Sequence, residues 1–171
     1  MPTRQPLPRL WLMTDERLGD GLFDAVARLP ADAGIVFRHY SLDDSARRSL
    51  FEQVRAAHPG LLLLAGPADL AERWGADGSH GPGPGCGLRT APAHDLAEIR
   101  AAEAAGASLI FLSPVFATHS HPEARPLGAD GFASLAALTR LPVIALGGMN
   151  AGRAQTLAGA YGWAGIDAWR G

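Results

Sequence analysis

The sequence predicts a parallel α/β fold, namely a compact (β/α)8 TIM-like barrel in which one or more outer helices are missing or shortened. Short, almost continuously apolar runs alternate with amphipathic stretches along the 171 residues. Such runs are typical of parallel strands that are covered on both faces. Eight of them are present, which is the number that closes a barrel of alternating strands and helices. An open doubly wound sheet would show the same alternation and stays the alternative.

The predicted strands are spaced along the whole chain. They cover residues 10–13, 34–37, 61–64, 77–79, 88–91, 109–112, 143–146 and 163–166. The clearest helices between them are predicted over residues 45–57, 94–105 and 130–138. Asp43, Asp44 and Ser45 are candidate N-caps for the first helix, and Asn150 is one for a helix after Gly148.

The length of the chain predicts a trimmed barrel, because such barrels usually have about 200 residues or more. Residues 80–87, HGPGPGCG, leave room for a loop but not for a helix after the fourth strand. Few residues follow the eighth strand, so we expect no closing helix. We expect one domain over residues 1–171. A second subunit would cover the end that lacks its helix, which makes a homodimer one expectation.

Composition narrows the function classes. The net charge is −2 and 47% of residues are hydrophobic, so neither a nucleic-acid partner nor an acidic tail is expected. No apolar run has the length of a membrane span and no signal peptide is seen, so we expect a cytoplasmic protein without membrane contact. All 15 cationic residues are arginine, which excludes lysine Schiff-base chemistry on this chain. Cys86 is the only cysteine and is expected in a loop.

A polar loop directly follows the predicted strand 109–112. It contains Thr118, His119, Ser120 and His121 within the segment SPVFATHSH, residues 113–121. Hydroxyl and imidazole groups can donate hydrogen bonds to a phosphate or diphosphate, and histidine can transfer a proton near neutral pH. The alternative is an ordinary solvated loop. Histidines alone do not make a metal site here, because no third ligand stands at a diagnostic spacing.

Two further features follow predicted strands. Gly147 and Gly148 come directly after PVIAL, where backbone amides can approach a phosphate closely, or where the chain simply turns tightly into a helix. Arg38 follows the strand 34–37, and its guanidinium suits bidentate phosphate binding. An ion pair with Asp15 or Asp43 is the alternative for Arg38. The carboxyl ends of parallel strands meet at one end of a barrel, so we expect these loops to form one site.

The ordered series SPVFATHSH, PLG (126–128) and PVIALGG (142–148) resembles the thiamine phosphate synthase family, including its TenI-like branch. GIVFRHYSL, residues 34–42, and WGADGSH, residues 74–80, resemble the family segments GVQLREK and GADGVHLGQ. The resemblance implies a barrel that couples a pyrimidine methyl diphosphate to a thiazole phosphate and releases diphosphate, in thiamine biosynthesis or salvage. Its partners would be small phosphorylated heterocyclic substrates.

The resemblance also implies roles for individual residues. By position, Arg38 matches the diphosphate-binding arginine, and His121 stands where the family has lysine; both are expected to be catalytic. The substrate-binding residues are then expected to be Thr118, His119, Ser120, Gly147 and Gly148.

Several positions depart from the family pattern. Ala65-Gly66 stands where the family has Asn-Asp, whose aspartate binds magnesium, and Asp167 stands where a serine helps to hold phosphate. The catalytic histidine of the TenI-like tautomerases aligns with Pro114. No protein metal site is therefore expected, and Mg²⁺ would enter through the substrate diphosphate. Two alternatives stay open: a TenI-like acid–base enzyme acting on a heterocycle, and a non-catalytic ligand-binding family member.

Overall fold

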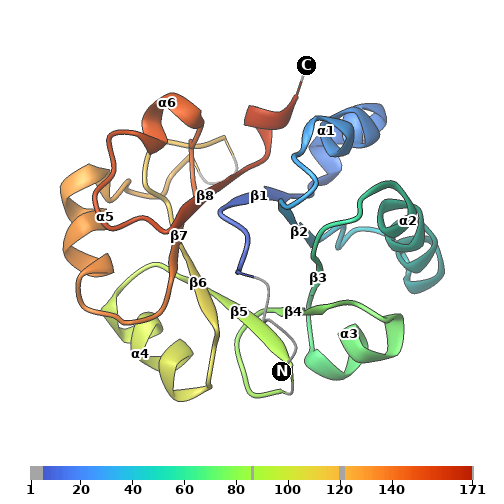
Figure 1. Cartoon of the computed structure of the whole chain (residues 1–171), viewed down its shortest axis with the longest axis horizontal. Coiled ribbons are helices and arrows are strands. Elements are labelled where there is room, and N and C mark those ends of the chain that lie inside the picture. Colours follow the sequence, from blue (N-terminus) through green and yellow to red (C-terminus); the bar gives the residue numbers. More distant parts are fainter. Residues whose placement is uncertain (1–5, 86, 120–121, 171) are drawn as a thin grey trace.

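The computed structural model describes residues 6–85, 87–119 and 122–170, and these form a closed barrel of parallel strands (Figure 1). Each strand pairs with the next along the chain, and the last pairs with the first, Leu10 opposite Trp163. The prediction of a (β/α)8 barrel is confirmed, and the open sheet is wrong. The strands are β1 (Leu10–Met13), β2 (Gly34–Phe37), β3 (Leu62–Ala65), β4 (Gly78–His80), β5 (Leu88–Ala93), β6 (Leu109–Leu112), β7 (Val143–Ala145) and β8 (Gly162–Gly165).

Helices surround most of the barrel (Figure 1). The α-helices are α1 (Leu22–Arg28), α2 (Asp44–Ala57), α3 (Ala68–Trp74), α4 (Leu96–Ala104), α5 (Gly128–Ala136) and α6 (Ala151–Ala154), with 3₁₀ segments η1 (Glu16–Gly21) and η2 (Asp167–Trp169). Of the three cap candidates before α2, Asp43 is the N-cap, and its carboxylate accepts from the amide of Ala46 at 2.9 Å. Asn150 caps α6 in the same way through the amide of Arg153. Among the described residues, no helix combines the length and apolar content that a bilayer crossing requires.

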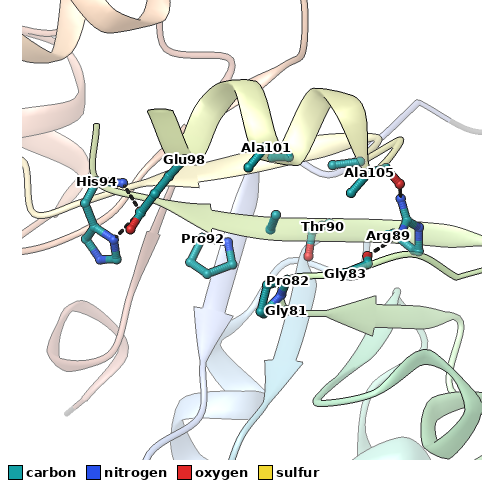
Figure 2. Close-up of a pocket in the computed structure, with 13 residues that line it drawn as sticks. Gly81, Pro82, Gly83, Arg89, Thr90, Pro92, His94, Glu98, Ala101 and Ala105 are labelled. Atoms are coloured by element: carbon teal, nitrogen blue, oxygen red, sulfur yellow. Dashed lines mark hydrogen bonds and ion pairs between the residues drawn. The ribbon is translucent and has the colours of Figure 1, made fainter. Parts of the chain in front are cut away.

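The predicted trimming of the barrel is confirmed for the described residues. Between β4 and β5, residues 81–85 and 87 form turns without a helix, and the described chain after β8 adds only η2. The outer face of β5 is therefore covered by α4 on one side only. A pocket of about 240 Å³ lies there, lined mainly by alanines of α4 and by the Gly-Pro loop (Figure 2).

Arg89 takes part of the role that a helix would have at this position. Its guanidinium reaches from β5 to the carbonyl oxygens of Gly83 in the loop and Ala105 at the end of α4 (Figure 2). At the other end of the pocket, His94 Nδ1 lies 2.7 Å from Glu98 Oε2. These polar contacts tie the Gly-Pro loop to α4 and leave the small pocket between them.

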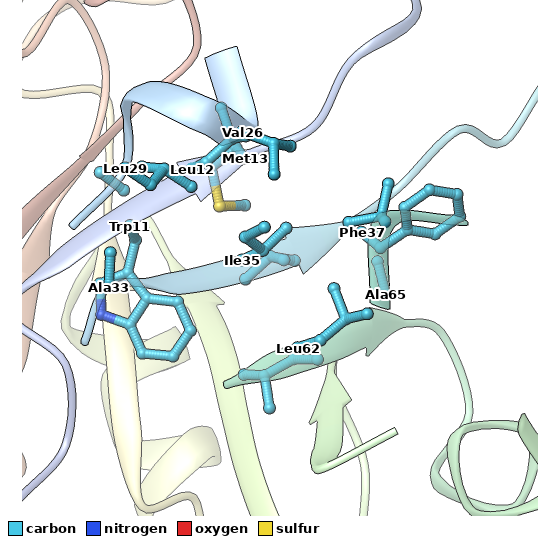
Figure 3. Close-up of a cluster of buried hydrophobic side chains, with 14 of the residues drawn as sticks. Trp11, Leu12, Met13, Val26, Leu29, Ala33, Ile35, Phe37, Leu62 and Ala65 are labelled. Carbon is cyan, nitrogen blue, oxygen red and sulfur yellow. The ribbon is translucent and has the colours of Figure 1, made fainter. Parts of the chain in front are cut away.

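Large buried side chains fill the part of the barrel interior that lies toward the amino-terminal ends of the strands. Trp11 on β1 is fully buried, meets Phe111 of β6 edge to face with ring centroids 5.4 Å apart, and donates its indole N–H to the carbonyl of Pro8. Figure 3 shows the indole beside β2 within the surrounding aliphatic cluster. Gly34 on β2 leaves room for the indole, because a Cβ at this position would lie 2.3 Å from the ring.

A layer of hydrogen-bonded polar side chains lies above these rings. His80, at the end of β4, packs edge to face on Phe111 at 5.0 Å, and its Nδ1 lies 2.9 Å from Thr90 Oγ1 on β5. Burial, with a smaller effect of the Arg38 charge, lowers the pKa of His80 to about 4. The imidazole is therefore neutral at physiological pH and is a fixed polar group in the floor of the barrel mouth.

We expect Gly34→Ala to lower the free energy of unfolding by about 2–3 kcal/mol, because the added methyl group would overlap the Trp11 ring in a packed core. Gly131→Ala on α5 is the matched control. Its Cβ would meet its nearest neighbour, Leu127 Cβ, at an ordinary 3.5 Å, and the better helix former should raise stability by about 1 kcal/mol. Urea unfolding of both variants measures this. Equal stabilities for Gly34→Ala and the native chain would contradict the placement of Trp11.

His80 is expected to make stability fall in acid. Its pKa is about 4 in the folded chain, while the unfolded value is about 6.5. As the pH falls from 6.5 towards 4, the unfolded chain binds a proton that the folded chain does not, so the unfolded state is favoured. The loss from pH 7.5 to pH 4.5 should be about 2–3 kcal/mol. Between these two pH values, the free energy of unfolding of His80→Asn should fall by about 2–3 kcal/mol less than that of the native chain. Urea unfolding at both pH values measures this. Parallel pH profiles of the two proteins would refute the assignment.

Candidate functional site

A large cavity occupies the end of the barrel at which the strands have their carboxyl termini. Its volume is about 1180 Å³, and loops that follow β1, β2, β5, β6, β7 and β8 contribute to its walls. The polar and charged side chains on these walls are Arg17, Arg38, His94, Ser113, Thr118, His119, Glu123, Asn150, Arg153 and Asp167. Among the described residues, the loops that follow these strands thus lie around one cavity, and their function as a site stays a prediction.

Arg38 lies directly after β2, and the loop after β1 fixes its guanidinium. Its Nε donates to the carbonyl of Thr14 at 2.7 Å, and its Nη2 lies 2.8 Å from Asp15 Oδ2. The amide of Arg38 also donates to Thr14 Oγ1 at 2.9 Å. Burial lowers the pKa of Arg38 and the Asp15 charge opposes this. Arg38 therefore lines the cavity and pairs with Asp15 rather than with Asp43, and phosphate binding by its guanidinium stays a prediction.

A chain of alternating charges crosses the mouth from this pair. Arg17 Nε lies 3.0 Å from Asp15 Oδ1, and Arg17 Nη1 lies 3.9 Å from Asp167 Oδ2. Asp167 also has Arg170 Nη1 at 3.5 Å and His119 Nδ1 at 3.7 Å. Burial alone would raise the pKa of Asp15, but hydrogen bonds from Arg17 and the Arg38 charge outweigh it, so its pKa lies below the usual value. Asp15 is thus ionised and balances the arginines.

The glycine turn, residues 147 and 148, has left-handed backbone angles, with φ of 98° at Gly147 and 61° at Gly148. A Cβ at Gly147 would lie 2.8 Å from Pro114 Cα, and one at Gly148 would lie 2.5 Å from the carbonyl oxygen of Ala117. Only glycine meets both requirements. Within the described part of the chain, the amides of residues 147–149 donate no hydrogen bond. The turn lines the cavity, and these three N–H groups have no acceptor within the described chain.

The loop after β6 lies against this turn. The amide of Phe116 donates to the carbonyl of Gly147 at 3.1 Å, and Thr118 and His119 line the cavity. The PLG segment holds the far end of the loop, because the amides of Leu127 and Gly128 donate to the carbonyls of Pro114 and Val115, both at 2.9 Å. The expected site residues Ser120 and His121 lie outside the described residues.

Three residues of the mouth, Thr14, His39 and Arg17, were not assigned to the site from the sequence, because their contacts are with loops that are distant in the chain. Thr14 holds the backbone of Arg38, and its hydroxyl also lies 3.0 Å from His39 Nδ1. Burial lowers the pKa of His39, against the raising effect of Glu16 and Asp15, and its ring stacks on Phe37 at 5.0 Å. Arg17 joins the two carboxylates. Its place one turn after β1 and the acidic pair before it are the only signals that could have indicated this.

The residues present do not form a magnesium site of the protein's own. Among the described residues, no group of three histidine, cysteine, aspartate or glutamate side chains could hold a metal ion. At Ala65, where the resemblance places the asparagine of the Asn-Asp pair, the carbonyl accepts a hydrogen bond from Arg47 Nη2 at 2.8 Å. The Arg47 charge beside this position disfavours a second cation. The absence of a protein metal site stays a prediction.

Comparison with known proteins agrees with the barrel and with the site loops. A family model described as thiamine monophosphate synthase matches residues 90–169. A protein of Aquifex aeolicus, provisionally named thiamine-phosphate synthase 2, is 34% identical over 94% of this chain and 97% of its own length. A thiamine-phosphate synthase of Chloroflexus aurantiacus is 30% identical over 94% of this chain and 84% of its own.

A solved structure adds the likeness of the fold. The thiamine phosphate pyrophosphorylase from Pyrococcus furiosus has a TM-score of 0.75 and 22% identity, over 94% of this chain and 86% of its own. The Aquifex relative spans nearly the whole of both chains, and the family model covers the strands β6 to β8 with their loops. The chain belongs to the thiamine phosphate synthase/TenI family.

Proposed function

We propose that this chain joins a pyrimidine methyl diphosphate to a thiazole phosphate and releases diphosphate, as a step of thiamine biosynthesis or salvage. The observation that carries the proposal is the single large cavity on which Arg38, the loop after β6 and the glycine turn come together. Family membership supplies the reaction class, and the cavity supplies cations for one substrate and amide donors for another.

The reaction requires the carbon–oxygen bond to the diphosphate to break with its electron pair leaving on oxygen. The methyl carbon becomes carbocation-like, and the lone pair of the thiazole nitrogen forms the new bond. Negative charge builds up on the leaving group, so fixed cations beside it stabilise the transition state more than the ground state. Arg38, fixed by Thr14 and Asp15, is the group that we assign to this role.

The loop after β6 is proposed to hold the same diphosphate from the opposite wall. Thr118 lines the cavity there, and Ser120 and His121 follow it in sequence. Placing the two rings at reacting distance removes the entropy cost of their encounter. We assign the glycine turn to the second substrate, the thiazole phosphate. The oxygens of its phosphate would accept hydrogen bonds from the amides of residues 147–149.

No protein group of the described chain clamps magnesium, so we assign no step to a metal ion. Magnesium would reach the site on the oxygens of the substrate diphosphate. Because such charged substrates do not cross a bilayer unaided, we expect the protein to act in the cytoplasm. The homodimer stays a prediction.

Arg38→Gln is expected to reduce kcat/KM for the pyrimidine diphosphate about 100-fold, because the leaving group loses a charged donor. Arg38→Lys should retain part of the activity through its charge. Arg48→Gln on α2 is the matched control, since Arg48 is exposed and pairs only with Glu52 among the described residues. Steady-state kinetics with circular dichroism of each variant measures this, and full activity of Arg38→Gln would remove Arg38 from the mechanism.

The proposed function itself is tested by product formation from the pyrimidine diphosphate and thiazole substrates, with added Mg²⁺ and with chelator, detected by mass spectrometry. We expect product with Mg²⁺ and a strong loss in His121→Ala, because that variant lacks the side chain standing in for the family lysine. If well-folded protein forms no product in either condition, the coupling reaction is wrong and a ligand-binding role takes its place.

A further inference from the structure

The pocket between α4 and the Gly-Pro loop lies on the outside of the barrel, where a helix after β4 would otherwise pack (Figure 2). Its volume is about 240 Å³, and most of its walls are small apolar side chains, among them Pro82, Ala91, Ala101 and Ala105. An apolar cavity of about 150 Å³ holds benzene. This pocket therefore has room for one aromatic ring with a short substituent.

The guanidinium of Arg89 forms one end of the pocket. Arg89 is only 5% exposed, and its two terminal nitrogens donate to the carbonyls of Gly83 and Ala105 (Figure 2). A guanidinium has more N–H donors than these two bonds use. Its Nε–H donates to no group of the described chain, and no buried polar side-chain atom of that chain lacks a partner. The Nε therefore reaches accessible space beside the pocket that Arg89 lines.

The positive charge of Arg89 has no counter-charge within the described chain. No carboxylate there pairs with it, and no aromatic ring lies over it. Arg47, the other buried arginine of the described residues, differs, because the rings of Tyr40 and Trp74 lie 5.3 and 5.5 Å from its guanidinium carbon. The carbonyls that Arg89 contacts carry only partial negative charge. A buried cation with partial compensation favours an anion beside it.

A carboxylate at the opposite end of the pocket sets the direction in which an anion would lie. Arg89 and His94 are five residues apart along β5 and its continuation, which is about 16 Å of extended chain. At the His94 end, Glu98 Oε2 lies 2.7 Å from His94 Nδ1 and accepts from the His94 amide at 2.8 Å. An anionic group is therefore attracted to the Arg89 end and repelled from the Glu98 end.

We propose that this pocket binds a small apolar monocarboxylate, with the carboxylate at Arg89 and the hydrocarbon part against the alanines of α4. The carboxylate oxygens accept from the Nε–H and a remaining terminal N–H, so both bonds from Arg89 to carbonyls are kept. The hydrocarbon part covers the apolar walls that the missing helix leaves open. The site is separate from the large cavity except at His94, which lines both, and it does not depend on the coupling reaction.

Three flat molecules of nearly the same shape test the charge preference, namely benzoate, benzamide and benzamidinium. Benzoate should bind the full chain at least about tenfold more tightly than neutral benzamide, because hydrogen bonds between charged groups are the stronger ones. Benzamidinium should bind most weakly. Calorimetric titration measures the three affinities. No binding of benzoate, or equal affinities for benzoate and benzamide, would overturn the proposal.

Replacement of Arg89 tests its assigned role. Arg89→Gln should weaken benzoate binding about tenfold and leave benzamide binding nearly unchanged. Arg100→Gln on α4 is the matched control, since Arg100 is exposed and pairs with Glu103. It should leave the affinity for benzoate unchanged. An equal loss of benzoate affinity in both variants would show a general effect of charge and not a site at Arg89.

A second variant leaves Arg89 in place, because Arg89→Gln also removes contacts of the Gly-Pro loop. Ala101→Leu should fill the pocket and abolish benzoate binding while circular dichroism stays native. Ala104→Leu is its matched control, since Ala104 is exposed on the same helix and does not line the pocket. Unchanged benzoate affinity in Ala101→Leu would show that the molecule binds elsewhere.

The arginines of the large cavity are the competing place for benzoate. In two-dimensional amide NMR spectra, added benzoate should shift the signals of Ala91, Ala101 and Ala105, and Arg38→Gln should bind benzoate as the native chain does. If the shifts are confined to residues 147–149 and binding is lost in Arg38→Gln, benzoate occupies the large cavity and the proposed site is wrong. Each outcome is independent of whether thiamine phosphate is formed.

Discussion

The closed parallel ladder is the constraint on which the rest of this structure depends. Because β8 pairs with β1, every strand has two neighbours and no strand edge needs covering. Closure also brings the carboxyl ends of all strands to one end of the barrel, whatever their separation in sequence. Arg38 after β2, the glycine turn after β7 and Asp167 after β8 meet on one cavity for this reason alone.

The ladder also explains why the chain tolerates its missing helices. Backbone hydrogen bonds hold β4 and β5 in place without a helix between them, Gly78 to His80 opposite Leu88 to Thr90. What is lost is apolar cover on the outside of β5. The side chains on that face are mostly small alanines. Arg89 donates hydrogen bonds to the carbonyl oxygens of Gly83 and Ala105 there. Small residues reduce the apolar surface that stays exposed.

Two carboxylates, Asp15 and Asp167, form the ion pairs at the mouth of the barrel. Asp15 and Asp167 each pair with arginines, but Arg17, Arg38, Arg153 and Arg170 lie on or beside the wall, so cations outnumber these two carboxylates. The two carboxylates have different settings. Asp15 is largely enclosed and fixes Arg38 through close contacts, whereas Asp167 is half-exposed and holds its partners at 3.5 Å or more. Enclosed pairs position a side chain firmly, while exposed pairs contribute little to stability and can be rearranged by a ligand.

The sequence by itself determined the architecture, because apolar runs, helix caps and glycine turns are local signals that act over a few residues. The eight runs predicted all eight strands, with small shifts at their ends. β3 and β4 lie one residue later than expected, β8 lies one residue earlier, β7 ends one residue earlier, and β5 continues through Pro92 to Ala93. These limits depend on the neighbouring strands, since the amide of Ser113 pairs with the carbonyl of Ala93. Arg38 and the glycine turn were also visible as polar or flexible residues after apolar runs.

Only the tertiary structure decided which charges pair and which groups are buried. Arg38 pairs with Asp15 and not with Asp43, and Arg17 lies between Asp15 and Asp167. His80 is a neutral group in the floor of the barrel mouth. Each of these depends on distances between loops that are far apart in sequence. A pairing energy falls off with distance and burial, neither of which a linear pattern contains. The order of the loops could therefore be predicted from the sequence. Which of their charged groups pair, and which are buried, could not.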